Sequence, residues 1–251
     1  MRFIAACAIG ILGAVQGVAS AAVIAQNGPV KATTDPVTGW QLRDGTFSDG
    51  LSSDGNYFYS QALGQKFSVA SGQTAVIGAI DFWGSTEYIA SKEPWAETSL
   101  SANVYAIEIS ILRITAGTSQ YPVVHSWTIN TQSMTQLLTG TYVPNVLSPV
   151  FQLSTVLSGN KVLTGGDYLL TIGGLQNNAD GDSFAWTDGI ADGSLPESQA
   201  YATVGDIPTE WGRWSAVNTG VSGAFVLTGT PAPGALALLG MAGFTRNRRR
   251  R

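Results

Sequence analysis

Alternation of apolar and polar side chains at every second position is the feature that most restricts the fold of this chain. It is clearest over residues 103–115, where Ile107, Ile109 and Ile111 share one face and Glu108 marks the other. A period of two residues is typical of a β-strand whose two faces differ in polarity, and β-branched residues favour strands. This segment is therefore predicted to be a strand.

Further segments of the same kind fill the centre of the chain, and turn-forming residues separate them. Strands are predicted at residues 63–69, 75–83, 123–129, 150–153, 167–172, 183–187 and 221–227. Turns are predicted at Ser71-Gly72, Gly165-Gly166, Gly173-Gly174, Asp180-Gly181, Asp188-Gly189 and Asp192-Gly193.

Helical patterns are scarce in the same region. Residues 131–138 predict one or two helical turns, too short to form a layer. Residues 22–60 predict a loosely ordered stretch followed by an edge strand around Trp40. Strands without crossover helices favour an all-β class. We expect an antiparallel β-sandwich, jelly-roll-like, with an N-terminal signal helix and a short C-terminal hydrophobic helix.

The first 21 residues have the parts of a secretory signal peptide. A positively charged start is followed by an apolar run over residues 3–18 and by a small-x-small motif at Ala19 and Ala21. Cleavage is predicted after Ala21 or Ala22. The single cysteine, Cys7, lies in this segment. The processed chain is therefore expected to have no disulfide and to depend on its core for stability.

Charge is distributed unevenly along the chain. Residues 22–229 hold all 17 acidic residues and only seven basic ones, a net charge of about −10. Such an acidic body argues against binding nucleic acid or an anionic surface through bulk electrostatics. Its length of about 210 residues is enough for one domain with a substantial core.

Residues 230–251 combine three unlike segments in a fixed order. The motif Pro231-Ala232-Pro233-Gly234 is stiff and non-helical. Residues 235–244 are apolar and contain small glycines. The end is cationic, with Arg246, Arg248, Arg249, Arg250 and Arg251. A motif, a membrane-seeking segment and a charge that stays in the cytoplasm together suit a sorting signal.

This tail resembles the PEP-CTERM sorting signal of Gram-negative bacteria, in which a Pro-Glu-Pro-like motif precedes a hydrophobic stretch and an arginine cluster. Ala232 stands where the usual pattern has glutamate. The resemblance implies processing within residues 231–234 by an exosortase-type membrane transpeptidase, after transient association with the inner membrane. It also implies a final location at the cell surface or in the extracellular polysaccharide matrix.

Together, these patterns and the resemblance of the tail divide the chain into a signal peptide (1–21), a β-sandwich domain (22–229) and a sorting tail (230–251). A plain C-terminal membrane anchor is the alternative interpretation of the tail. The apolar run has ten residues, whereas a spanning helix needs about twenty. The preceding prolines cannot extend it as a regular helix, so a transient substrate fits better than a permanent anchor.

Catalytic motifs are missing from the sequence. The single histidine, His125, alternates with Val123 and Trp127, so we expect a hydrogen-bonded structural residue that faces the core. No second histidine completes a zinc site or a nucleophile–base pair. Paired carboxylates for glycoside hydrolysis would have to come from Glu87, Glu93, Glu97 and Glu108. Their separation does not follow from the sequence, and we expect a protein without enzymatic activity.

Four aspartates lie close together among glycines: Asp180, Asp182, Asp188 and Asp192. Calcium takes several oxygen ligands from flexible loops, so a calcium site is one interpretation. The spacing departs from the EF-hand pattern, because Phe184 occupies the place of a third ligand. Each Asp-Gly pair also forms a turn on its own. Turns are the favoured interpretation, and no other cofactor is expected.

The chain has seven tryptophans, and an exposed indole can stack on a sugar ring. Trp95, Trp211 and Trp214 lie in polar segments with a nearby proline and are the candidates for stacking, whereas Trp83 and Trp127 are expected in the core. The sequence thus favours an exported structural or interaction protein with a transpeptidase as partner. A module that binds extracellular polysaccharide and a calcium-dependent adhesin are the alternatives.

Overall fold

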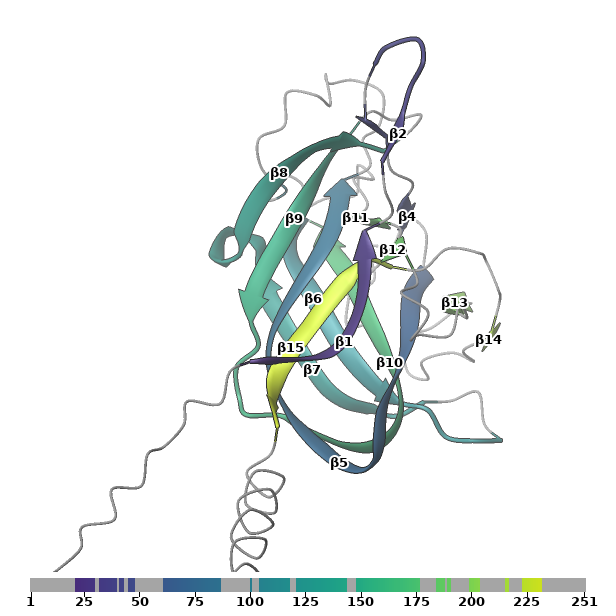
Figure 1. Ribbon diagram of the computed structural model, residues 1–251, viewed down its shortest axis with the longest axis vertical. Helices are drawn as coiled ribbons and strands as arrows, with labels where there is room; N and C mark the ends of the chain where they lie inside the picture. Colours follow the sequence, from purple (N-terminus) through teal and green to yellow (C-terminus); the bar gives the residue numbers. More distant parts are fainter. Residues whose placement is uncertain are drawn as a thin grey trace, which may run out of the picture.

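The computed structural model describes residues 21–29, 32–39, 41–42, 45–47, 61–86, 100, 104–117, 121–143, 148–176, 184–187, 189–190, 199–203, 215–216 and 223–231. These residues form an all-β fold (Figure 1), which confirms the predicted class. The strand pairs are antiparallel except for the short pair of β3 (Gln41–Leu42) with β8 (Thr135–Tyr142).

The longest strand, β5 (Gln61–Thr86), organises the sheet, because strands pair along both of its halves. The remaining strands are β1 (Ala22–Pro29), β2 (Thr33–Thr34), β4 (Gly45–Phe47), β6 (Val104–Arg113), β7 (Val123–Asn130), β9 (Pro149–Val156), β10 (Val162–Gln176), β11 (Phe184–Thr187), β12 (Gly189–Ile190), β13 (Gln199–Thr203), β14 (Ser215–Ala216) and β15 (Phe225–Pro231).

Two runs of strands share β5. The run β13-β5-β10-β6-β7 uses mainly its first half, and the run β1-β15-β5-β9-β8 uses its second half. Figure 1 shows β5 curving through the molecule between these two sets of neighbours. The strands predicted at residues 63–69 and 75–83 are therefore one continuous element.

The turn predicted at Ser71-Gly72 does not separate two strands, because it lies inside the continuous strand β5. Gly72 has a φ of 76°, a left-handed value that favours glycine, yet β5 continues through it. The paired strand β10 bends at the same place, where its register with β5 shifts between Thr164 and Gly166. A Cβ on Gly165 would lie 2.8 Å from the carbonyl oxygen of Ala70. These glycines thus allow two backbones to pack closely at a shared bend.

Arg113, at the end of β6, fixes the same bend. Its guanidinium donates hydrogen bonds to the carbonyl oxygen of Gly165 at 2.9 Å and to the hydroxyl of Tyr168 at 2.7 Å. Gly166 leaves room for this group, since a Cβ there would lie 2.4 Å from a guanidinium nitrogen. The planar fork of an arginine can bind several acceptors at once, so one side chain connects β6 to β10.

One cluster of buried apolar side chains joins the two runs of strands. It includes Leu63, Phe67, Ile80, Phe82, Ile107, Ile109, Ile111, Trp127, Leu153, Leu170, Ile172, Phe184, Trp186, Phe225 and Leu227. Burial of apolar surface on this scale is the main force that holds such a fold together. The predicted core position of Trp127 is confirmed, whereas Trp83 is only half-buried.

Both faces of β6 are buried, which the predicted pattern of one apolar and one polar face does not anticipate. Glu108 is only 3% exposed and Ser110 only 1%. The Ser110 hydroxyl donates a hydrogen bond to the Glu108 carboxylate at 3.1 Å. Buried polar groups are normally paired in this way, so these two residues are accommodated as a hydrogen-bonded pair.

The helix predicted over residues 131–138 is wrong beyond its first turn. Only η3 (Thr131–Ser133) is helical, a single 3-10 turn, and the chain then enters β8. The Asn130 side chain accepts a hydrogen bond from the Gln132 N–H and caps this turn. The Thr131 hydroxyl donates to the carbonyl of Val104 at 2.7 Å. Both contacts lie at the start of the turn. The turn ends at Met134, whose backbone is extended (φ −88°, ψ 148°) and leads into β8.

The two outer segments of the body meet in the sheet. β1 is a paired strand, so the loose start predicted for residues 22–60 is wrong there. Its register with β15 aligns Ala22 with Gly229 and Asn27 with Phe225. Asn27, 1% exposed, donates a hydrogen bond to the carbonyl of Gly223 at 3.1 Å. Residues close to the predicted signal cleavage therefore lie beside residues close to the sorting motif.

The turn between β2 and β3 contains a carboxylate with a shifted pKa. The Thr38 hydroxyl and the Val37 N–H donate hydrogen bonds to the Asp35 side chain at 2.6 and 2.9 Å, and they hold the pKa of Asp35 below its usual value. A lowered pKa stabilises the folded turn above the unfolded pKa, and this stabilisation is lost as the pH falls through the folded value. Carbon-13 NMR titration should show the low midpoint, and Thr38→Val should raise it. An unchanged midpoint in Thr38→Val would contradict this assignment.

Candidate functional site

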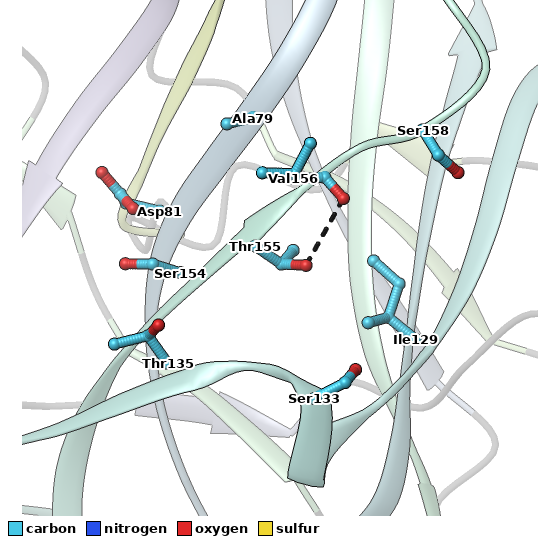
Figure 2. Close-up of a pocket in the computed structure, with 9 residues that line it drawn as sticks. All are labelled: Ala79, Asp81, Ile129, Ser133, Thr135, Ser154, Thr155, Val156 and Ser158. Atoms are coloured by element: carbon cyan, nitrogen blue, oxygen red, sulfur yellow. Dashed lines mark hydrogen bonds between the residues drawn. The ribbon is translucent and has the colours of Figure 1, made fainter.

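A groove of about 570 Å³ opens where β8 separates from β9 (Figure 2). Pairing of β8 with β9 begins at Thr135, opposite Ser154. The preceding residues form η3 and turn toward β7 instead. Thr155 and Val156 therefore pair with β5 but not with β8. The early end of the helical turn thus leaves an open space beside β9.

Strand register places three polar side chains in one row at the groove. Asp81 of β5 pairs with Ser154 of β9, and Ser154 pairs with Thr135 of β8. The neighbours of Asp81 in sequence, Ile80 and Phe82, are 1% and 0% exposed. Successive side chains of a strand point to opposite faces, so Asp81 lies on the face away from the core. Figure 2 shows these three residues on one side of the groove.

Hydroxyl groups dominate the lining, which also has three apolar side chains. The hydroxyls belong to Ser133, Thr135, Ser154, Thr155 and Ser158, and the apolar residues are Ala79, Ile129 and Val156. Val156 is 77% exposed, which is unusual for a valine on a strand. The lining therefore offers both polar and apolar contacts.

Two of these hydroxyls already use their hydrogen atoms within the protein. The Ser133 hydroxyl donates to the carbonyl of Asn130 at 2.7 Å. The Thr155 hydroxyl makes a long contact of 3.5 Å with the carbonyl of Val156. A hydroxyl oxygen can also accept hydrogen bonds. Both groups therefore retain the ability to accept from a ligand.

Trp127 holds Ser158, a residue of the groove lining, in place. Its indole N–H donates to the carbonyl of Ser158 at 2.9 Å, which ties β7 to the segment after β9. The ring of His125 lies beside it at a centroid distance of 6.0 Å, and its Nε2 donates to the carbonyl of Val162 at 2.9 Å. His125 is hydrogen-bonded as expected, and it is half-buried on the face of β7 that also carries the buried Trp127. Both residues support the wall and do not line the groove.

Among the described residues that line the groove, Asp81 is the one with an ionisable side chain. Within the described part of the chain, no lysine, arginine or histidine lines the groove. Hydroxyls and one carboxylate form a neutral to negative surface that can accept and donate hydrogen bonds. Such a surface is suited to binding a polar ligand that carries no negative charge.

Of the carboxylates considered for glycoside hydrolysis, Glu108 alone belongs to the described residues. It is buried on β6 and does not line the groove. Glu87, Glu93 and Glu97 lie outside the described residues. The described structure therefore brings no predicted carboxylate pair together.

Most predicted site residues fall outside the described ranges. This holds for the signal-peptide residue Ala19 and for all residues of the sorting tail after Pro231, and for Trp95, Trp211, Trp214, Asp180, Asp182, Asp188 and Asp192. It also holds for both predicted terminal helices, in residues 1–20 and 232–251. Ala21 is exposed directly before β1. Pro231 ends β15, where it pairs with Ala75 of β5.

The described ranges hold neither a metal-binding cluster nor a membrane-spanning helix. They contain no group of three or more histidine, cysteine, aspartate or glutamate side chains that is arranged to hold a metal ion. The same ranges contain no helix of the length and hydropathy needed to cross a membrane.

The groove residues are absent from the sequence-based site predictions. Serine and threonine on an exposed strand face give no signal of their own, because they are also common where nothing binds. The only sequence signal of the groove is Asp81, a charged residue inside an otherwise apolar segment. Comparison of the chain with protein-family models, with curated proteins and with solved structures finds no match.

Proposed function

We propose that this protein is exported, sorted through its PEP-CTERM-like tail and retained as a structural or interaction protein at the cell surface or in the extracellular matrix. The order of a proline motif, an apolar run and an arginine cluster in residues 230–251 is the observation that carries the proposal. The proposed role is non-enzymatic, and an exosortase-type transpeptidase is the proposed processing partner.

The proposed body is an antiparallel β-sandwich of jelly-roll type. The two runs of strands that share β5 would form its two layers. Support comes from the single apolar cluster, which takes Ile109 and Leu170 from one run and Phe82 and Phe225 from the other. Two sheets that bury their apolar faces against each other are a common solution for an all-β chain.

The ends of the described body support the proposed processing. Ala22 pairs with Gly229, and Pro231 pairs with Ala75. Three residues separate Pro231 from the apolar run that begins at Ala235. An extended chain spans at most about 3.3–3.6 Å per residue, so these three reach roughly 10 Å. A tail inserted in the membrane would hold the folded body close to its surface during processing.

Expression with and without an exosortase-type transpeptidase tests the proposal. Without the enzyme, the full tail should remain on the chain and the protein should stay with the inner membrane. With the enzyme, the C-terminus should shorten to within residues 231–234 and the protein should leave that membrane. Identical C-termini under both conditions would instead favour a plain anchor.

The two other functions considered from the sequence gain no support from the structure. Sugar stacking by Trp95, Trp211 or Trp214 and calcium binding near Asp180 and Asp192 depend on residues outside the described ranges.

A further inference from the structure

We propose that the groove between β9 and η3 binds a short stretch of an uncharged polysaccharide. The inference rests on the proposed function in one respect: a protein at the cell surface or in the matrix would contact extracellular polysaccharide. The binding site itself is argued from the residues that line the groove.

The lining matches the hydrogen-bonding groups of a sugar. Sugar hydroxyls both donate and accept. The hydroxyls of Thr135, Ser154 and Ser158 in the lining can do the same, and those of Ser133 and Thr155 can accept. The Asp81 carboxylate adds a strong acceptor, and hydrogen bonds to a charged group are stronger than neutral ones. The row Asp81, Ser154 and Thr135 crosses three neighbouring strands. These groups are therefore spaced along the surface, and each can contact a different hydroxyl of one polysaccharide chain.

The charge of the groove selects against acidic ligands. The only ionisable group among its described lining residues is a carboxylate, and the chain as a whole carries a net charge of −4. A phosphate, a uronic acid or a nucleic acid would meet repulsion and no compensating cation. An uncharged glycan avoids this penalty.

Apolar side chains beside the polar row suit the weakly polar faces of sugar rings. Val156 and Ile129 lie in the groove. Trp83 follows Asp81 by two residues on β5, so it shares the same face of the strand, and it is half-buried. An indole on this face offers a flat apolar surface next to polar groups. Trp83 does not line the groove itself, but it extends the strand face of Asp81 with an aromatic side chain.

Size and shape favour a segment of a chain over an enclosed small molecule. The volume of about 570 Å³ lies within the range of roughly 300–1,000 Å³ found for ligand pockets. The groove is open to solvent and not enclosed. An open groove can take one stretch of a polymer without enclosing the rest of the chain.

Calorimetric and NMR titration of the full chain would test the site, in a detergent without a sugar headgroup. The probes are hexasaccharides of glucan and mannan type, with a polyuronate hexamer as the charged comparison. We expect binding of at least one neutral hexasaccharide and at least tenfold weaker binding of the polyuronate. Asp81→Ala should weaken the neutral ligand about tenfold, Asp81→Asn less because it keeps an acceptor, and Thr155→Val about threefold.

Thr128→Val is the matched control. Thr128 is exposed on β7 directly before Ile129 but does not line the groove, so binding should stay within twofold. Circular dichroism should first confirm that every variant is folded. Absence of binding by every neutral hexasaccharide, a preference for the polyuronate, or equal binding by Asp81→Ala would each overturn the proposal. Processing of the tail is measured separately by mass spectrometry. A failure of the proposed sorting function would therefore not affect the interpretation of the binding titration.

Discussion

Trp186→Ala is expected to lower the free energy of unfolding by about 3–5 kcal/mol, the cost typical of deleting a large aromatic side chain from a core. Trp186 is 1% exposed. Its indole N–H donates to the carbonyl of Ala224 at 2.9 Å, and its ring lies 6.4 Å from that of Phe225. A Cβ on Gly223 would lie 2.2 Å from the indole, so the ring packs directly on backbone. That backbone leads into β15, and it cannot easily move to fill the cavity.

Urea unfolding followed by circular dichroism measures this effect. Val37→Ala is the control, because Val37 is 90% exposed and surface substitutions usually change stability by less than about 0.5 kcal/mol. A loss below about 1 kcal/mol in Trp186→Ala would show that Trp186 does not anchor β11 to β15. Since natural domains are stable by only about 5–15 kcal/mol, the expected loss is large enough to unfold part of the population.

Replacing the five tail arginines with serine is expected to abolish both membrane retention and processing. The residues are Arg246, Arg248, Arg249, Arg250 and Arg251. Moving one arginine to the centre of a membrane costs about 2.5–3.5 kcal/mol on insertion scales. The arginine cluster should therefore stop the tail from crossing the inner membrane. The apolar run of ten residues is too short to hold on its own. The serine variant should therefore be exported with its tail uncut.

The matched control replaces the same five arginines with lysine and keeps the charge. Retention and cleavage should then survive, because the positive-inside rule applies to both residue types. Fractionation and mass of the C-terminus provide the measurement. If the serine variant were cut as efficiently as the native chain, the arginine cluster would have no role in sorting.

Strand positions were largely predictable, because alternation is a local property of the sequence. The segments predicted at residues 103–115 and 123–129 correspond to β6 and β7. The conformation of the chain at glycine pairs was not predictable in the same way. Gly165-Gly166 looks like a turn in the sequence, but it lies inside β10 at a shared bend with β5. Whether a glycine pair ends a strand or lies within one depends on a partner strand that is far away in sequence.

The sequence pattern likewise did not predict that the polar face of β6 is buried. Glu108 and Ser110 alternate with isoleucines, which indicates a solvent-facing side, yet both are buried. The pattern records residue polarity, whereas burial depends on what else in the chain packs over that face. A hydrogen bond between the two residues reduces the cost of burying them.

The groove could not be predicted because its residues come from separate elements. Asp81 and Ser154 are 73 positions apart in the chain, and only the register of β5 with β9 brings them together. Register is set by pairing over whole strands, which a local pattern does not contain. The sequence directed the search for exposed tryptophan to Trp95, Trp211 and Trp214, whereas in the structure Trp83 shares a strand face with the groove residue Asp81.

Intact mass of the native protein, combined with cell fractionation, tests the central claim most directly. The sorting account predicts a species that begins at Ala22 or Val23, ends within residues 231–234 and lies outside the inner membrane. A protein that keeps its C-terminal arginines and remains in the inner membrane would contradict the account and identify the tail as a plain anchor.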